Sequence, residues 1–244
     1  MNFVKIELLQ LIEGARQARG LTVIIDVFRA FSVECTLYDA GVREVLAVGR
    51  TETARRLKEE HPEYILVGER GGVILPGFDF GNSPSQIRRE LLPGRTVVHT
   101  TSAGTQGIVN AAGASEIVTG SLVNARAVAS YIRERAPEDV SLVCMGLRGE
   151  IEAPEDVLCG RYIRSLLTGE ALDWNQEMTI LREKPSARKF FDPEKQAVFP
   201  EADYWMCTDR DRFDFVLQVT PREEDVFSVR RLPGQADGRR EAWI

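Results

Sequence analysis

The feature of this chain that most constrains its fold is a repeated alternation of short apolar runs and longer amphipathic segments across its first two thirds. Each run is rich in β-branched residues and is bounded by polar residues or glycine, which is the pattern of a buried strand. The first of them, Val23-Ile24-Ile25, ends at Asp26. Strands are therefore expected at residues 21–26, 44–48, 64–69, 95–101, 116–120 and 140–146.

Amphipathic segments between these runs predict helices. Gly41 stands where one helix would stop, and Pro154 occupies the favoured first position of another. The expected helices cover residues 32–40, 51–61, 105–112, 124–135 and 154–167. Strand, loop and helix in repeated order are typical of a sheet covered by helices on both faces. The sequence therefore predicts an α/β protein, a three-layer α/β/α fold around a largely parallel or mixed sheet.

The alternation of strand and helix patterns weakens beyond Gly169, which predicts that one compact unit has a regular and a less regular part. Residues 1–168 form the expected α/β core. Residues 169–232 form a less regular C-terminal α+β lobe, with a helix over residues 174–191 and two late strands near residues 213–219 and 226–229. Residues 233–244 are polar and are expected to be a flexible tail.

The composition excludes several classes of function. The formal net charge is −6, from 31 basic and 37 acidic residues, whereas nonspecific nucleic-acid binding requires a broad basic face. No segment has the pattern of a signal peptide or of a membrane span, so we expect a cytoplasmic protein that binds neither nucleic acid nor membrane. The four cysteines are widely spaced and form no CxxC pair, which favours buried thiols.

The available side chains also limit the metal that the protein can bind. Only two histidines are present, so a metal site must be built mainly from carboxylates. Carboxylate oxygens suit Mg²⁺ better than Zn²⁺. The expected cofactor, if the chain has one, is therefore Mg²⁺.

Charged and hydroxyl residues follow the predicted strands. Ligands of open α/β sheets bind at the carboxyl ends of the strands, where carboxylates can hold a cation while arginines and backbone N–H groups hold an oxyanion. An irregular loop at residues 77–84 adds a further acid and an amide. The candidate residues are Asp26, Arg29, Glu69, Arg70, Asp79, Asn82, Thr100, Thr101, Gly104, Thr105, Arg148, Glu155 and Asp156.

Each of these candidates has a structural alternative. Asp26 can cap the next helix or pair with Arg29. Acids such as Glu155 and Asp156 are common in a first helical turn, where they complement the helix dipole. The Thr100–Thr105 segment can be a turn and an N-cap, Glu69-Arg70 a surface ion pair, and the loop at 77–84 a tight connection.

Taken together and in this order, these stretches resemble the 2-phosphosulfolactate phosphatase family. The resemblance covers roughly residues 20–165 and rests on the segments at residues 23–30, 68–72, 77–84, 100–105, 120–125 and 155–160. It implies an α/β/α fold and a homodimer. It also implies an Mg²⁺-dependent phosphoric monoester hydrolase that releases phosphate from 2-phospho-3-sulfolactate, or a related small phosphorylated carboxylate, on the route to coenzyme M or sulfolactate.

Roles for the candidate residues follow from the strand ends and the resemblance together. Candidate catalytic groups are Asp26, Glu69 and Asp79. Candidate metal ligands are Asp26, Glu155 and Asp156. Candidate substrate-binding residues are Arg29, Arg70, Asn82, Thr100, Thr101, Gly104, Thr105 and Arg148. Attack on phosphorus by a carboxylate and attack by water both stay open, although Asp26 lacks the second aspartate two positions later that a phospho-aspartyl route would use.

One departure from the family pattern supports a second hypothesis. The hydroxyl turn usually carries Asn-Gly-Thr, and this chain reads Ala103-Gly104-Thr105. The loss of that side-chain amide favours a catalytically silent anion-binding or regulatory homologue with the same fold. Release of phosphate from a generic ester, with Mg²⁺ and with a chelator, distinguishes the two hypotheses.

Overall fold

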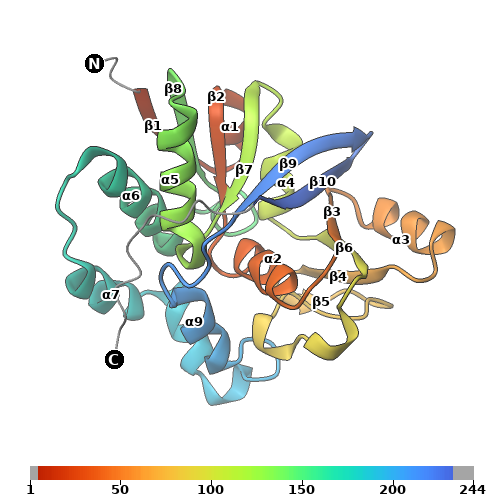
Figure 1. The fold of residues 1–244 in the computed structure, drawn as a ribbon. Helices are drawn as coiled ribbons and strands as arrows, with labels where there is room; N and C mark the ends of the chain where they lie inside the picture. The colour runs from red at the N-terminus through yellow and green to blue at the C-terminus, as the bar shows by residue number, and fades with distance from the viewer. Residues whose placement is uncertain (1–4, 233–244) are drawn as a thin grey trace.

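The computed structural model describes residues 5–232, which form one mixed sheet with helices around it (Figure 1). The flexible tail predicted for residues 233–244 lies outside the described residues. The strands are β1 (Lys5–Gln10), β2 (Gly20–Ile25), β3 (Glu44–Val48), β4 (Ile65–Arg70), β5 (Val73–Ile74), β6 (Thr96–Thr100), β7 (Ala114–Gly120), β8 (Asp139–Cys144), β9 (Val216–Glu223) and β10 (Val226–Leu232).

Helices connect most of the strands. The α-helices are α1 (Leu11–Gln17), α2 (Ala30–Asp39), α3 (Thr51–Glu60), α4 (Gly104–Asn110), α5 (Ala125–Arg135), α6 (Pro154–Thr168), α7 (Trp174–Arg182), α8 (Pro185–Arg188) and α9 (Glu201–Thr208). Short 3-10 turns lie at η1 (Pro84–Gln86), η2 (Arg89–Leu91), η3 (Leu122–Asn124), η4 (Lys189–Phe191) and η5 (Pro193–Lys195). Within residues 5–232, no helix combines the length and the apolar character that a membrane crossing needs.

The strands follow the order β1-β8-β2-β7-β9-β10-β3-β6-β4-β5. The first four pair in parallel, as do β3, β6 and β4. The antiparallel hairpin β9–β10 lies between these two groups, pairing with β7 on one side and with β3 on the other. Three consecutive antiparallel pairings mean that the two parallel groups run in opposite directions along the sheet.

Three apolar clusters hold the helices to the sheet. Side chains alternate between the faces of a strand, so Ile24 of β2 belongs to a cluster with α1, α2 and α4, whereas its neighbours Val23 and Ile25 belong to another with α5, α6 and the C-terminal helices. A third cluster lies under α3. The predicted three-layer α/β/α fold is confirmed.

The C-terminal segment differs from its prediction in two respects. Residues 174–191 were expected to form one helix, but Pro185 lacks an N–H and begins a separate short helix after α7 ends at Arg182. The two late strands were expected to form a hairpin around Pro221; they do form a hairpin, but Pro221 lies inside β9 and the turn is closer to Asp225. This hairpin is central to the sheet and joins its two halves. The predicted elements omit β1 and α1, which are also present.

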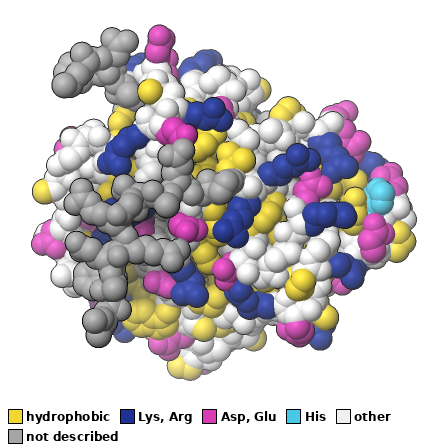
Figure 2. All heavy atoms as spheres, in the orientation of Figure 1, with side chains coloured by type: hydrophobic (Ala, Val, Ile, Leu, Met, Phe, Trp, Pro, Cys, Tyr) yellow, Lys and Arg dark blue, Asp and Glu magenta, His cyan; other side chains and the backbone are white. Residues whose placement is uncertain are grey.

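The surface around the hairpin carries paired charges. Figure 2 shows acidic, basic and apolar side chains intermixed on this face of the molecule. Arg222 and Arg230 both lie within ion-pair distance of Glu44, and Arg56 lies 2.6 Å from Glu223. These basic side chains therefore contribute little unbalanced positive charge.

Candidate functional site

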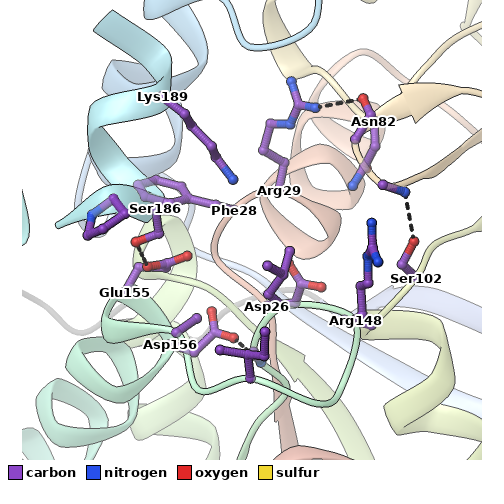
Figure 3. Close-up of a pocket in the computed structure, with 18 of the residues that line it drawn as sticks. Asp26, Phe28, Arg29, Asn82, Ser102, Arg148, Glu155, Asp156, Ser186 and Lys189 are labelled. Carbon is purple, nitrogen blue, oxygen red and sulfur yellow. Dashed lines mark hydrogen bonds between the residues drawn. The ribbon is translucent and has the colours of Figure 1, made fainter. Parts of the chain in front are cut away.

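A cavity of about 440 Å³ opens where segments from both halves of the sheet meet. Its wall is formed by the loops after β2, β4, β6 and β8, the start of α6, and the C-terminal stretch that includes η4 (Figure 3). Acids, cations and apolar side chains all contribute to it. The principal lining side chains are Asp26, Glu69, Glu155, Asp156, Arg29, Arg148, Lys189, Asn82, Ser102, Phe28, Leu147, Ile151 and Phe199.

Asp26 lies at the centre of this cavity, directly after β2. Its Oδ1 accepts the N–H of Ala30, 3.1 Å away, so it caps the start of α2. Burial, together with the nearby charges of Glu69 and Glu155, raises the pKa of Asp26 to about 7, while the N–H groups of Ala30 and Gly104 oppose the shift. A glycine is needed at 104 because a Cβ there would lie 3.0 Å from Asp26 Oδ2.

Asp156 holds two loops next to Asp26, the one after β2 and the one after β8. Its Oδ1 accepts the N–H of Val27 and its Oδ2 the N–H of Gly146, both at 2.8 Å. Burial raises the pKa of the Asp156 carboxyl well above its usual value, and the charges of Asp26 and Glu155 add to the rise. Asp156 therefore ties the ends of β2 and β8 to the first turn of α6.

Lys189 faces these acids from the C-terminal segment. Burial lowers the pKa of its ammonium, while burial raises that of Glu155, whose Oε2 accepts the hydroxyl of Ser186 at 2.6 Å. The Lys189 Nζ lies 4.6 Å from the centre of the Phe199 ring, a cation–π distance. Figure 3 shows the ends of Lys189 and Arg148 directed toward the space above Asp26.

Glu69 is held at the cavity wall by backbone donors. Its Oε1 accepts the N–H of Ser102 and its Oε2 the N–H of Gly72, both at 2.6 Å. At Gly72 a Cβ would lie 2.5 Å from the Phe199 ring, so the loop after β4 approaches the C-terminal segment closely. Glu69 thus joins the loops after β4 and β6.

Arg29 lines the cavity but does not pair with Asp26. Its Nη1 lies 2.6 Å from Asp203 Oδ2 in a fully buried ion pair, and it also donates to the carbonyl of Val198. The other oxygen of Asp203 accepts the hydroxyl of Ser83 at 3.0 Å. Arg29 therefore anchors the C-terminal segment over the cavity, and the pairing of Asp26 with Arg29 considered from the sequence is absent.

Arg148 is the least constrained of the predicted arginines. Within residues 5–232 it makes no hydrogen bond or ion pair, and its backbone has φ 59°, a region that few non-glycine residues adopt. Its Nη2 lies over Gly71. It lines both the main cavity and an adjacent depression, whose other lining residues are Arg70, Gly71, Thr101, Ser102 and Gln106.

The predicted hydroxyl turn acts mainly as a helix cap. Thr105 donates its N–H to the hydroxyl of Thr101 at 3.2 Å, and the N–H of Thr101 donates to the Thr105 hydroxyl at 3.0 Å. The hydroxyl of Thr100 accepts from Arg70. Neither Thr100 nor Thr105 lines the cavity, where Ser102 and Ala103 lie instead. Side-chain hydroxyls of this turn are satisfied within the protein.

Asp79 lies outside the cavity. Its carboxylate is substantially exposed, accepts the N–H of Leu66 at 2.8 Å and lies 3.6 Å from Lys58. Asn82, from the same loop, does line the cavity. The structure thus does not bring Asp79 to the other predicted catalytic residues, because the loop turns its side chain toward the surface near α3.

The predicted metal ligands Asp26, Glu155 and Asp156 gather on one side of the cavity. The charge of Glu155 contributes to the raised pKa of Asp26, and the charges of Asp26 and Glu155 contribute to the raised pKa of Asp156. Among the described residues, no three acidic, histidine or cysteine side chains converge tightly enough to form a ready-made metal site. Hard oxygen donors that repel one another nevertheless fit a divalent cation, which would offset their charge.

Sequence reasoning missed the residues that the C-terminal segment contributes. Lys189, Ser186 and Phe199 line the cavity, and Asp203 pairs with Arg29 behind it. The aromatic residues of this segment favour either a lobe packed over the site or a subunit interface. No local pattern pointed to Lys189, Ser186 or Asp203 as members of the site.

The fold and the cavity define a three-layer α/β/α protein with a cavity among the loops at the ends of its strands. Residues 7–220 match the family model of the 2-phosphosulpholactate phosphatases. The chain belongs to this family, so the resemblance seen in the motifs is confirmed.

Several relatives carry the same description, probable 2-phosphosulfolactate phosphatase. The protein from Bacillus subtilis is 30% identical over 216 residues, covering 87% of this chain and 92% of the relative. That from Thermotoga petrophila is 36% identical over 218 residues, covering 86% and 92%. That from Deinococcus radiodurans is 41% identical over 148 residues, and the match spans 60% of this chain and 62% of that relative, less than two thirds of its length.

Proposed function

We propose that this protein is an Mg²⁺-dependent phosphomonoesterase that hydrolyses 2-phospho-3-sulfolactate, or a related small phosphorylated carboxylate, to the hydroxy acid and phosphate. The observation that carries the proposal is one cavity with an acidic wall facing a cationic one. Family membership supports the reaction. The cavity volume of about 440 Å³ falls in the range of small-molecule sites.

The acidic wall would hold the metal. Asp26, Glu155 and Asp156 supply hard oxygen donors, and each is buried beside the others. When bound, Mg²⁺ supplies positive charge that offsets the phosphoryl oxygens as charge builds up on them. Asp156 accepts an N–H from the loop after β2 and another from the loop after β8, so it holds the two loops together and gives the acidic wall a fixed shape.

The cationic wall would bind the anionic groups of the substrate. A phosphate, a sulfonate and a carboxylate in one small molecule need several cationic or N–H donors. Arg148 has its guanidinium donors unused within the described chain, and Lys189 holds an ammonium against Phe199 beside Glu155. Arg29 adds positive charge, although Asp203 already pairs with it.

The remaining walls are apolar. Phe28, Leu147, Ile151 and Phe199 line the cavity and reduce its water content once a ligand fills it. In such surroundings, electrostatic interactions between the substrate and its cations are stronger than in bulk water.

The alternative, a catalytically silent anion-binding homologue, also has an observation in its favour. Ala103 lies on the cavity wall, where the usual asparagine of the family would place a polar side chain. The carboxylates of the acidic wall would be a costly feature for a protein that only binds anions, because they repel an anionic ligand. This favours the enzyme.

Phosphate release is the test. We expect the purified protein to release phosphate from 2-phospho-3-sulfolactate with Mg²⁺, more slowly from p-nitrophenyl phosphate, and from neither in the presence of EDTA. Binding of inorganic phosphate without turnover of either ester would favour the silent homologue. Full turnover after EDTA treatment would contradict the metal requirement.

We also propose that the enzyme is a cytoplasmic homodimer. The family resemblance supports the dimer, and the four free, buried cysteines suit a reducing compartment. Sedimentation equilibrium at micromolar concentration is expected to give twice the chain mass of 27.3 kDa. A mass close to that of one chain would contradict the dimer.

A further inference from the structure

Glu34, His99 and Asn82 form a buried chain that runs from the core to the cavity. His99 Nδ1 lies 3.0 Å from Glu34 Oε1, and His99 Nε2 lies 3.2 Å from Asn82 Oδ1. Glu34 and His99 have no exposed surface, and Asn82 is 5% exposed. The three come from α2, β6 and the loop after β5, so the tertiary fold alone brings them together.

The neighbours of the imidazole define its charge. Glu34 Oε1 faces Nδ1 and Asn82 Oδ1 faces Nε2. Two oxygen acceptors suit a ring that carries an N–H at both nitrogens, which is the positively charged form of the imidazole. The other oxygen of Glu34, Oε2, is buried without a hydrogen-bond partner in residues 5–232. The contact with His99 is therefore the one side-chain hydrogen bond of the Glu34 carboxyl group within the described residues.

The same contact gives the orientation of the Asn82 amide. Because Oδ1 accepts from His99, the amide NH₂ is the free end of the side chain. Asn82 lines the cavity, and its Nδ2 has no hydrogen-bond partner among the described residues. Nδ2 is also not one of the fully buried atoms that lack a partner, so it is accessible from the cavity. A neutral imidazole with an open lone pair at Nε2 would instead attract the NH₂ group. The amide oxygen would then face the cavity and repel an anion.

We propose that Asn82 binds an anionic oxygen of the substrate through its NH₂ group, and that the Glu34–His99 pair positions it by keeping His99 charged. The inference rests on the proposed function only in taking the substrate to be a small phosphorylated acid. Asn82 touches the ligand, whereas Glu34 and His99 act through Asn82.

A purely structural role explains the chain less well. A buried ion pair is often replaced by apolar residues of similar volume without loss of stability. Here the pair lies between α2 and β6, which both contribute apolar side chains to one buried cluster. Its one further side-chain hydrogen bond among the described residues goes to Asn82, which reaches the cavity. Positioning a ligand-binding amide accounts for both the charge and the direction of the chain.

Kinetics of single and double variants test the proposal. Asn82→Ala removes the donor and Glu34→Gln removes the charge that keeps His99 protonated. A hydrogen bond to a charged group is worth roughly a tenfold or larger effect, so each variant is expected to raise KM about tenfold with a smaller change in kcat. Asn82→Asp, which keeps an acceptor toward His99 and places a negative oxygen in the cavity, is expected to raise KM further.

The double variant separates positioning from a structural role. If Glu34 acts through Asn82, then Glu34→Gln in the Asn82→Ala background leaves KM unchanged while it still lowers the melting temperature. Glu44→Gln, at a partly buried glutamate that begins β3 and pairs with Arg222, is the matched control and is expected to leave KM unaltered. Independent, multiplying effects of Glu34→Gln and Asn82→Ala would overturn the proposal.

A spectroscopic measurement tests the charge itself. The chain has only His61 and His99, and His61 is about half exposed, so ¹⁵N-histidine labelling with His61→Asn for assignment isolates the His99 ring. Both ring nitrogens of His99 are expected to be protonated at pH 7.5 in the unaltered protein, and one of them in Glu34→Gln. A neutral His99 ring in the unaltered protein would overturn the proposal.

These measurements also separate this inference from the proposed function. If the unaltered protein releases no phosphate, the proposed function fails, but calorimetry with inorganic phosphate still compares it with Asn82→Ala and Glu34→Gln. Weaker phosphate binding in both variants would support the positioning pair. Equal binding in all three proteins would overturn it.

Discussion

Asp26 is a residue at which stability and chemistry oppose each other. It is buried beside other acids, and burial together with their charges raises its pKa to about 7. A carboxyl that must ionise in such surroundings costs folding free energy. The cost is justified where the group binds a cation or transfers a proton, as the cavity around Asp26 suggests.

We predict that Asp26→Asn lowers kcat by about a hundredfold or more and leaves the melting temperature of the metal-free protein equal or higher. The reason is that asparagine can still accept the N–H of Ala30 and no longer repels Glu155. Phosphate-release kinetics and calorimetric melting of the same preparation provide the check. Asp79→Asn, at an exposed carboxylate outside the cavity, is the control. Near-normal turnover with early melting would make Asp26 a scaffold residue.

Lys189 lines the cavity with an ammonium group whose pKa is lowered by burial. The ammonium lies against the ring of Phe199. We predict that Lys189→Gln raises KM for the phosphorylated substrate about tenfold, as expected for a lost charged hydrogen bond, without lowering the melting temperature. Lys195→Gln, at an exposed lysine paired with Asp192, is the matched control. Equal KM values for both variants would remove Lys189 from the substrate-binding wall.

At the scale of elements, the turn before α4 shows how a hydroxyl pair supports the site indirectly. Thr101 and Thr105 bond to each other across the first turn of α4, which also holds Gly104 against Asp26. The turn is therefore important for the shape of the acidic wall, even though its threonines do not line the cavity.

We predict that Thr101→Val, which loses the hydroxyl that accepts from Thr105, costs about 1 kcal/mol, as for other lost helix caps. The melting temperature should fall by about 2–4 °C, with a modest fall in kcat/KM. Thr101→Ser keeps the hydroxyl and should retain both values. A large loss of kcat/KM without any change in melting temperature would show that the Thr101 hydroxyl contacts the substrate.

At the scale of the whole molecule, the hairpin β9–β10 joins two parallel groups of strands that run in opposite directions. Both groups contribute loops to the cavity. The site therefore depends on a segment near the C-terminal end of the described chain, which pairs with β7 and β3 at once.

We predict that Leu217→Ala, at a fully buried position of β9, lowers the free energy of unfolding by about 2–5 kcal/mol. Both parallel groups should still unfold in one transition, because the hairpin couples them. Circular dichroism and tryptophan fluorescence followed through urea unfolding would test this. Thr220→Ala, at an exposed position of the same strand, is the control. Two separated transitions would contradict the coupling.

The proposed metal site also depends on the whole folded molecule. If Asp26, Glu155 and Asp156 hold Mg²⁺, then Mg²⁺ at about a hundred times its Kd should stabilise the fold by about 2.7 kcal/mol, because the ion binds only the folded state. We predict a matching rise in melting temperature on adding MgCl₂ to metal-free protein, and a much smaller rise in Glu155→Gln. NaCl at equal ionic strength is the control. The same shift for both salts would contradict a specific site.

Local sequence patterns were sufficient for much of the core. Val23-Ile24-Ile25 is buried on both sides as the run predicted, and α6 begins at Pro154 and ends before Gly169. These features depend on neighbouring residues, whose side-chain spacing is readable along the chain. The placement of Asp26 and Glu69 at the carboxyl ends of predicted strands made them candidates for one cavity, and the structure brings them together.

Tertiary structure alone decided which distant groups meet. Asp156 holds Val27 across a separation of 129 residues, and Arg29 pairs with Asp203 across 174. Lys189 reaches the cavity from a segment whose local pattern is irregular, while Asp79 turns away from it. Contacts of this kind depend on how the helices and strands pack, because the chain folds back on itself. The sequence by itself determined the elements and the residue types at their ends, and the packing of those elements decided which of these residues share one site.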